Sequence, residues 1–192
     1  MKQQVKSQIR EWTESIVIAV ILALVIRAFV IQAFKIPSGS MIPTFQIGDR
    51  LFVSKFIYGA RIPFTGIRLP AVRQPKRGDI IVFVSPEDPK KDFIKRLIAV
   101  GPETVEIRDR RIYIDGKEVD EPASIRSIDY YNGGIYGQEG QVTRVPEGEY
   151  FVMGDNSANS RDSRYWGFVP KKNLIGKAEF IFWPPHRIRI PK

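Results

Sequence analysis

Hydrophobic residues run almost without interruption near the N-terminus of the chain and fall into short, separated runs after it. Residues 16–34 read IVIAVILALVIRAFVIQAF, and only Arg27 and Gln32 interrupt the apolar sequence. A helix of this length, at about 1.5 Å per residue, would be roughly 28 Å long, which is close to the thickness of the hydrocarbon core of a bilayer. The pattern therefore predicts a membrane-spanning helix over 16–34.

A cleaved signal peptide and a buried core helix are the alternatives for this run. Lys2, Lys6 and Arg10 resemble the basic start of a signal peptide, but the run is long for one and no small-x-small cleavage site follows it. A core helix seldom stays apolar on every face over this length. We favour a retained anchor. The Lys and Arg residues before it lean towards a cytoplasmic N-terminus and an exported C-terminal part, although Lys35 follows the run.

The rest of the chain alternates short apolar runs with turn residues. The runs are RLFVSKFIYG, GDIIVFVS, DFIKRLIAV, TVEIRD, RIYIDGKEV, GEYFVMGD and AEFIFW, each bounded by Gly, Pro or Asp. Asp115-Gly116 indicates a tight hairpin, because a type I′ turn needs positive φ angles. Few windows keep a helical period, although 43–47 or 171–174 could form a turn. The pattern predicts a mainly β, antiparallel domain built as a coiled sheet or barrel.

These elements divide the chain into three predicted segments. Residues 1–34 would hold a cytoplasmic N-terminus and a single transmembrane anchor. Residues 35–106 and 149–192 would form the β-rich core. Residues 107–148 would form a short inserted subdomain that is rich in hairpins.

Composition narrows the chemistry and the partners. Lys and Arg number 30 against 21 Asp and Glu, so the formal net charge is +9, which favours an anionic partner such as nucleic acid or a lipid surface. The chain has no Cys and one His, His186, which excludes disulfides, thiol catalysis and clustered histidine metal sites. We therefore expect neither a cofactor nor a metal ion.

Basic residues concentrate between Asp49 and Asp79, where the sequence has no acidic residue. They are Arg50, Lys55, Arg61, Arg68, Arg73, Lys76 and Arg77, and the aromatic residues Phe56, Tyr58 and Phe64 lie among them. A solvated loop, a surface at the lipid headgroups and a surface for single-stranded nucleic acid all fit this pattern. Because the predicted anchor lies just upstream, we expect membrane lipids rather than nucleic acid as the partner.

The segment directly after the apolar run could carry a nucleophile. Two prolines bracket the Ser-Gly-Ser sequence within 36–44, which predicts a kinked turn with exposed backbone N–H groups. A simple linker has a similar composition, but Ile36, Met41 and Ile42 would then have nothing to pack against. An ordered turn offers a hydroxyl beside free N–H groups, as a nucleophile with an oxyanion hole requires.

A serine nucleophile needs a base, and Lys95 is the candidate. His186 lies in Trp-Pro-Pro-His-Arg near the C-terminus, where we expect it to be structural or exposed. On a strand, Lys95 shares a face with Phe93, Leu97 and Ala99, and such neighbours would remove water from its ammonium group. A lysine acts as a base once its pKa falls by a few units from about 10.4. The alternative is an edge-strand lysine that limits aggregation.

A third polar segment, 154–167, lies between the apolar runs EYFVM and FVP. It could be an ordinary loop. It could also hold a base in place through hydrogen bonds and an Asp–Arg pair.

Together these segments resemble the signature boxes of the bacterial type I signal peptidases, or leader peptidases. The serine box P-S-G-S-M-x-P-T, the G-D box, the strand box R-G-D-I with the following Lys-Arg pair, and the box G-D-N-x-x-x-S-x-D-S-R appear in the family's order. They match residues 37–44, 48–59, 77–83 with 95–96, and 154–164. The chain departs from the family at 99–103, where the order of Gly and Pro is inverted.

The resemblance implies a membrane-bound serine endopeptidase that removes N-terminal signal peptides by cutting after an Ala-x-Ala-like site. Ser40 would be the nucleophile and Lys95 the general base, while the Ser40 N–H and the Ser38 hydroxyl would form the oxyanion hole. Ser160 would orient the Lys95 amine. The further support residues would be Arg96, Asp155, Asp162 and Arg164, and the pocket residues would be Phe34, Ile36, Met41, Phe93 and Ile94.

The resemblance also implies a place in the cell. The protein would span the bacterial cytoplasmic membrane once, with its catalytic domain on the extracytoplasmic side and the secretion translocon nearby. Its partners would be preprotein signal peptides and anionic membrane lipids. Two other classes stay open at this point: a cytosolic Ser/Lys self-cleaving regulator, and a non-catalytic, membrane-tethered β-module.

Overall fold

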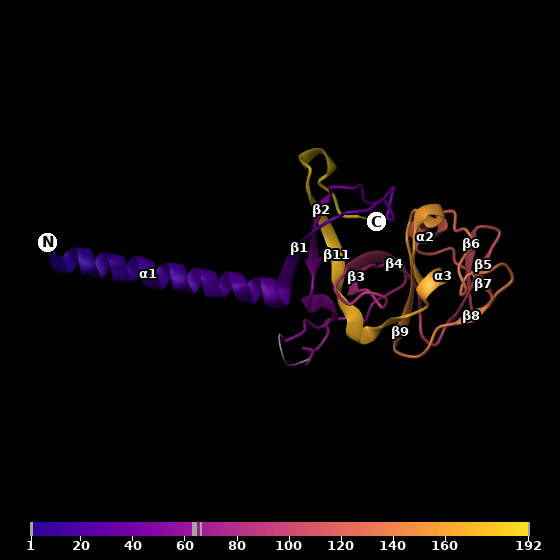
Figure 1. Ribbon diagram of the computed structural model, residues 1–192, viewed down its shortest axis with the longest axis horizontal. Coiled ribbons are helices and arrows are strands. Elements are labelled where there is room, and N and C mark those ends of the chain that lie inside the picture. The colour runs from indigo at the N-terminus through magenta and orange to yellow at the C-terminus, as the bar shows by residue number, and fades with distance from the viewer. Residues whose placement is uncertain (1, 63–64, 66, 192) are drawn as a thin grey trace.

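A long helix extends from one side of a β-domain in the computed structural model, which describes residues 2–62, 65 and 67–191 (Figure 1). Helix α1 covers Lys2–Val25 and continues as a π-helical turn, η1, over Ile26–Val30. Its segment Arg10–Val30 has a mean hydropathy of 2.3, and none of it is buried against the rest of the protein. Such length and exposed apolar surface are what a membrane-spanning helix requires.

The helix is shorter at its C-terminal end than the predicted span 16–34. Ile31–Lys35 form strand β1, which pairs antiparallel with β2 (Arg50–Ser54). Pairing with β2 satisfies the backbone groups of these residues outside a helix, and Ile31 and Phe34 are residue types that suit a strand. The exposed apolar helix therefore ends at about residue 30, and 31–34 belong to the sheet.

The β-domain has a curled antiparallel sheet next to the helix and a smaller sheet at the far end (Figure 1). The large sheet has the order β1-β2-β11-β3-β4-β9-β10 and the small sheet the order β7-β6-β5-β8. Shifts in register interrupt the pairing of β11 and of β4, and bulges of this kind increase the curl of a sheet. The predicted mainly β, antiparallel architecture is confirmed. The remaining strands are β3 (Ile80–Val84), β4 (Asp92–Val100), β5 (Thr104–Arg108), β6 (Arg111–Ile114), β7 (Lys117–Glu118), β8 (Thr143–Arg144), β9 (Glu149–Met153), β10 (Val169–Pro170) and β11 (Leu174–Trp183).

Every apolar run named above contributes a strand, and the predicted hairpin is present. Asp115 and Gly116 have φ angles of 50° and 76° and connect β6 to β7, as a type I′ turn requires. The short strands β8 and β10 were not predicted. Helical structure after α1 is limited, in the described residues, to single turns: α2 (Ala123–Arg126), α3 (Ser163–Trp166), η2 (Phe56–Tyr58), η3 (Ser157–Asn159), η4 (Lys171–Asn173) and η5 (Pro185–Arg187).

The small sheet starts at Thr104, before the predicted boundary of the insert at 107, and shares a hydrophobic core with the large sheet. Ile107 and Ile125 of the inserted region pack in the same cluster as Ile98 of β4 and Phe151 of β9. This shared core fixes the insert, including α2, against the strands that carry the polar residues described next.

Candidate active site

The connection from β1 to β2 is an ordered turn rather than a linker. Residues 37–45, called the serine turn here, are held by a hydrogen bond from the Phe45 N–H to the Met41 carbonyl at 2.8 Å. Met41 and Phe45 are fully buried in a cluster with Leu51 and Val53 of β2. Because these side chains anchor the turn in the core, Ser40 is held in a defined position near the surface.

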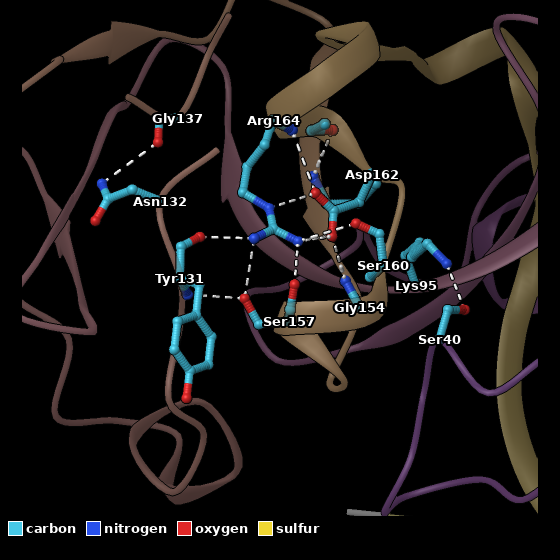
Figure 2. A network of polar contacts seen from close by, with 12 residues as sticks. Ser40, Lys95, Tyr131, Asn132, Gly137, Gly154, Ser157, Ser160, Asp162 and Arg164 are labelled. Atoms are coloured by element: carbon cyan, nitrogen blue, oxygen red, sulfur yellow. Dashed lines mark hydrogen bonds and ion pairs between the residues drawn. The ribbon is translucent and has the colours of Figure 1, made fainter. Parts of the chain in front are cut away.

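Lys95 of β4 reaches the serine turn. Its Nζ donates a hydrogen bond to Ser40 Oγ at 2.6 Å, as Figure 2 shows. Lys95 is only 4% exposed, and its Nζ lies 5.8 Å from the centre of the Phe93 ring. The fold thus brings the predicted nucleophile and the predicted base into direct contact.

Burial sets the proton affinity of Lys95. Loss of water around the ammonium group lowers the pKa of Lys95 from 10.5 to about 8, although the carboxylates of Asp162 and Asp155 partly oppose the shift. The amine is therefore neutral in a large fraction of molecules near pH 8, as a general base must be. The sequence predicted that Phe93, Leu97 and Ala99 share one face of the strand with Lys95. Phe93 and Leu97 do pack in one hydrophobic cluster, but the register shift after Leu97 places Ala99 in a different cluster.

Arg96 and Asp155 form a buried ion pair beside the dyad. Arg96 Nε and Nη2 donate to the two carboxylate oxygens of Asp155 at 2.7 and 2.6 Å, and the two side chains are 1% and 0% exposed. Thr44 Oγ1 of the serine turn donates to the same carboxylate at 2.5 Å. The pair therefore ties the serine turn to β4 and to the end of β9.

Arg164 and Asp162 form a second buried pair, which shapes the loop after β9. Arg164 Nε and Nη2 donate to Asp162 at 2.8 Å each, and Asp162 Oδ2 accepts from the Gly154 N–H at 3.0 Å (Figure 2). Arg164 also donates to the carbonyls of Ser157 and Tyr131, at 2.7 and 2.6 Å. The predicted support residues are thus joined as two ion pairs around the Ser40–Lys95 contact.

Ser160, which was predicted to orient the Lys95 amine, makes no hydrogen bond to it in the described part of the chain. Its Oγ is buried and accepts or donates no hydrogen bond within the described part of the chain, and the Lys95 amine binds Ser40 instead. The hydroxyl nevertheless lies close to the site, because a Cβ added to Gly154 would collide both with Ser160 Oγ and with the carbonyl oxygen of Ser40. Only glycine fits at position 154, where the chain directly after β9 passes close to the Ser40 carbonyl.

Asn156 is a site residue to which the sequence alone assigned no role. Its backbone N–H donates to the Ser40 carbonyl at 3.1 Å, and its Nδ2 donates to the Gly39 carbonyl at 3.0 Å. Asn159 Nδ2 donates to Asn156 Oδ1 at 3.3 Å, which orients the amide. The Asn of the G-D-N box was visible as part of a motif, but a motif does not tell where its side chain points.

A cavity of about 570 Å³ opens beside the dyad. Ser38, Ser40 and Lys95 line it together with Phe93 and Ile94, two of the residues expected in the substrate pocket. The other predicted pocket residues do not line it. Ile36 and Met41 are buried in the core below the serine turn, and Phe34 packs against that same cluster.

No group of three or more His, Cys, Asp or Glu side chains that could hold a metal ion occurs in residues 2–62, 65 and 67–191. His186 lies exposed in η5, in agreement with the prediction. The polar groups that the structure places at the site are a serine hydroxyl, a desolvated amine and two buried ion pairs.

Comparison with known proteins identifies the family. Residues 9–183 match the family model described as signal peptidase, peptidase S26. The chain belongs to the signal peptidase family. This signal peptidase is 35% identical to signal peptidase I of Pseudomonas aeruginosa, over 91% of this chain and 73% of that protein. It is 38% identical to signal peptidase I of Bacillus licheniformis, over 96% of this chain and 94% of that protein.

Two further comparisons give similar results. Signal peptidase I T of Bacillus subtilis is 38% identical over 95% of this chain and 89% of that protein. A crystal structure of a signal peptidase I from Enterococcus faecalis is 37% identical, with a TM-score of 0.45, and covers 55% of this chain and 97% of that chain. The protein is thus a serine peptidase that removes signal peptides, and with its apolar helix α1 it fits a membrane-anchored bacterial enzyme. The self-cleaving regulator and the non-catalytic module are set aside.

Proposed function

We propose that this signal peptidase cleaves preproteins with a dyad of Ser40 and Lys95, after an Ala-x-Ala-like site, at the outer face of the bacterial cytoplasmic membrane. The observation that carries the proposal is the 2.6 Å contact between Ser40 Oγ and Lys95 Nζ, with the lysine buried. A serine and a desolvated lysine in hydrogen-bond contact are sufficient for acyl transfer without a histidine.

The reaction would proceed in two halves. Neutral Lys95 takes the proton of Ser40 as Oγ attacks the scissile carbonyl carbon, and the resulting oxyanion is stabilised by the Ser40 N–H and the Ser38 hydroxyl. The tetrahedral intermediate collapses, the C–N bond breaks, and the Lys95 ammonium gives its proton to the leaving amine. Water then attacks the acyl ester while Lys95 again takes a proton. Cleavage of the ester bond returns a proton to Ser40.

The cavity beside the dyad supports a preference for small side chains before the cut. Its apolar lining residues are Phe93 and Ile94 of β4 and Pro37 of the serine turn. Apolar walls close to the nucleophile favour a small apolar group such as the methyl of alanine, and a large ring placed next to Ser40 would displace the peptide from the dyad.

Cleavage of a defined preprotein tests the proposal. The purified enzyme in detergent should release a mature protein whose N-terminus, located by mass spectrometry, follows the Ala-x-Ala sequence. Replacing the last alanine of the signal peptide by tryptophan should lower kcat/KM by at least about 100-fold. The same replacement well upstream, in the apolar part of the signal peptide, is the control and should have little effect. Cleavage at another bond, or equal cleavage of both substrates, would contradict the proposed specificity.

We infer that membrane lipid is a partner of the β-domain as well as of α1. The described residues of the segment 59–72, which are 59–62, 65 and 67–72, and the turn η5 lie on the side of the domain from which α1 leaves (Figure 1). Ile67, Leu69 and Val72 of this segment are 59%, 42% and 71% exposed. Because α1 leaves the domain on this side, apolar side chains there would enter the interfacial region of the bilayer that α1 spans.

The basic residues at 50–78 contribute less to this surface than their number implies. Lys55 and Arg68 donate to backbone carbonyls, Arg73 pairs with Asp79 at 2.7 Å, and Arg77 pairs with Glu103 at 2.6 Å. Arg50, Arg61 and Lys76 are exposed and would face anionic lipid. Phe56 is exposed and Tyr58 is buried, while Phe64 lies outside the described residues. Because several of these basic side chains already bind carbonyls or carboxylates, fewer of them are free to contact a nucleic-acid backbone, and this favours lipid as the partner.

We further propose that α1 crosses the membrane once with its N-terminus in the cytoplasm, which would place the dyad where signal peptides leave the secretion translocon. The excess of Lys and Arg before the span supports this orientation. Protease added to intact spheroplasts should digest the β-domain and leave an epitope at the N-terminus protected. If the epitope were digested and the β-domain survived, the orientation of α1 would be the opposite of the one proposed.

A further inference from the structure

A second cavity, of about 460 Å³, adjoins the site on the other side of the serine turn. Residues 42–44 of that turn line it together with residues of the inserted region that include Ser127 and Asp129. Its floor contains the buried Arg96–Asp155 pair, whose charges neutralise each other. The second cavity therefore connects the insert directly to the segment that carries Ser40.

The two cavities share the lining residue Asn156 and adjoin along the serine turn, and together they are called the groove here. Residues 37–40 of the serine turn line the first cavity and residues 42–44 line the second. The loop after β9 also lines both cavities: Asn159 and Arg161 lie at the first, 157–158 at the second, and Asn156 at both. Because Asn156 binds the carbonyls of Gly39 and Ser40, the two cavities meet next to the nucleophile.

An extended substrate must occupy both sides of the nucleophile. Each residue of an extended peptide spans about 3.3–3.6 Å, so a few residues on either side of the scissile bond already reach beyond the dyad. The first cavity has the apolar walls that suit the end of a signal peptide. The second cavity is the continuation of the groove, and its size is within the range of about 300–1,000 Å³ typical of ligand sites.

We propose that the second cavity binds the first residues of the mature protein, on the leaving-group side of the scissile bond, and that Asp129 makes it prefer basic over acidic side chains there. Asp129 is exposed at the cavity and makes no ion pair in the described part of the chain. Ser124 and Ser127 add hydroxyl groups, which suit a polar, extended segment. The inserted region thereby takes part in substrate selection. This inference rests on the proposed cleavage by Ser40 and Lys95.

Paired peptide substrates test the charge preference. The peptides are identical up to the scissile bond and carry either Lys or Glu as the second residue after it. The wild-type enzyme should prefer the Lys peptide by about threefold in kcat/KM, as for other exposed charge pairs. Asp129→Asn should remove the preference and Asp129→Lys should invert it. Asp120→Asn and Asp120→Lys, at an exposed acidic residue of the same insert outside the groove, are the matched controls and should keep the wild-type ratio.

A second variant tests occupancy of the cavity. Ser127→Trp should lower kcat/KM at least about 10-fold for a peptide with several residues after the scissile bond. It should leave unchanged the hydrolysis of an ester that ends at the scissile bond, and that ester also shows that each variant is folded. The same Lys-to-Glu ratio in all enzymes, or equal loss of ester and peptide cleavage in Ser127→Trp, would overturn the inference while the dyad stands. Failure of the wild-type enzyme to cut either peptide would overturn the proposed function as well.

Discussion

Replacement of Lys95 by methionine should lower kcat/KM for preprotein cleavage by about 10⁴-fold or more. Methionine keeps the apolar stem and removes the amine that contacts Ser40 Oγ at 2.6 Å. Without a base, the hydroxyl remains protonated and nucleophilic attack is lost. Ser40→Ala and the double variant should have the same residual activity as Lys95→Met, because the effects of substitutions at residues that act as one unit are not additive. Rates are measured with one preprotein under single-turnover conditions.

Lys177→Met is the matched control for this experiment. Lys177 also lies on a strand of the same sheet, but it is only partly buried and its ammonium pairs with Glu179 at 2.8 Å. The control variant should cleave at close to the wild-type rate. If Lys95→Met retained more than about a tenth of wild-type activity, a dyad mechanism that depends on the lysine would be wrong.

The same lysine fixes the pH dependence of the reaction. With the pKa of Lys95 lowered to about 8, kcat/KM should rise roughly tenfold per pH unit below that value and level off above it. The residual kcat/KM of Lys95→Met should not show this rise with pH. A wild-type rate that stays constant down to about pH 5 would exclude Lys95 as the base.

Lys95→Met should also be more stable than the wild type, although it is inactive. The pKa of Lys95 is about 8 in the folded protein and 10.5 in the unfolded chain, so between these values the unfolded chain binds more protons. Wild-type stability therefore rises with pH across this window, and the cost of burying the amine is largest below pH 8. That cost is about 3 kcal/mol for a shift of this size. Urea unfolding of both proteins should show the difference at pH 7 and its decline towards pH 10.5.

Local sequence patterns predicted the strands well, because the position of each strand depends mainly on the apolar and turn residues within it and next to it. Alternating apolar residues bounded by turn residues located β3, β4 and β9, and the positive φ angles of Asp115 and Gly116 followed from residue type alone. The boundary between α1 and β1 could not be found in this way. An apolar helix in lipid and a half-buried strand use the same residues, and only pairing with β2 decides where one changes into the other.

The sequence motifs named candidate residues, but they did not predict where each side chain points. Motif order was enough to name Ser40 and Lys95, which the fold brings into contact. The direction of each side chain in the serine turn depends on tertiary packing. Met41 was therefore expected in a pocket and is buried in the core instead. The second cavity could not be predicted from the sequence, because it is lined by residues 42–44 and by residues of the insert, which lie far apart along the chain.

Replacement of Asp155 by alanine should lower the free energy of unfolding by about 3–5 kcal/mol, the typical cost of removing one partner of a buried ion pair. The guanidinium of Arg96, 1% exposed, would lose its counter-charge, and Thr44 would lose the acceptor that fixes the serine turn. Glu87→Ala is the control, because the Arg161–Glu87 pair is exposed at the surface. Its loss should cost less than about 1 kcal/mol.

A second replacement separates the two roles of the Arg96–Asp155 pair. In Asp155→Ala combined with Arg96→Leu, the buried charge is absent altogether, so much of the lost stability should return. Cleavage activity should remain low, because neither residue then connects β4 to the serine turn through Thr44. Urea unfolding and preprotein cleavage are measured on the same samples. If the double variant regained both stability and activity, the pair would act only through its charge balance, and its proposed role in holding Ser40 against Lys95 would be wrong.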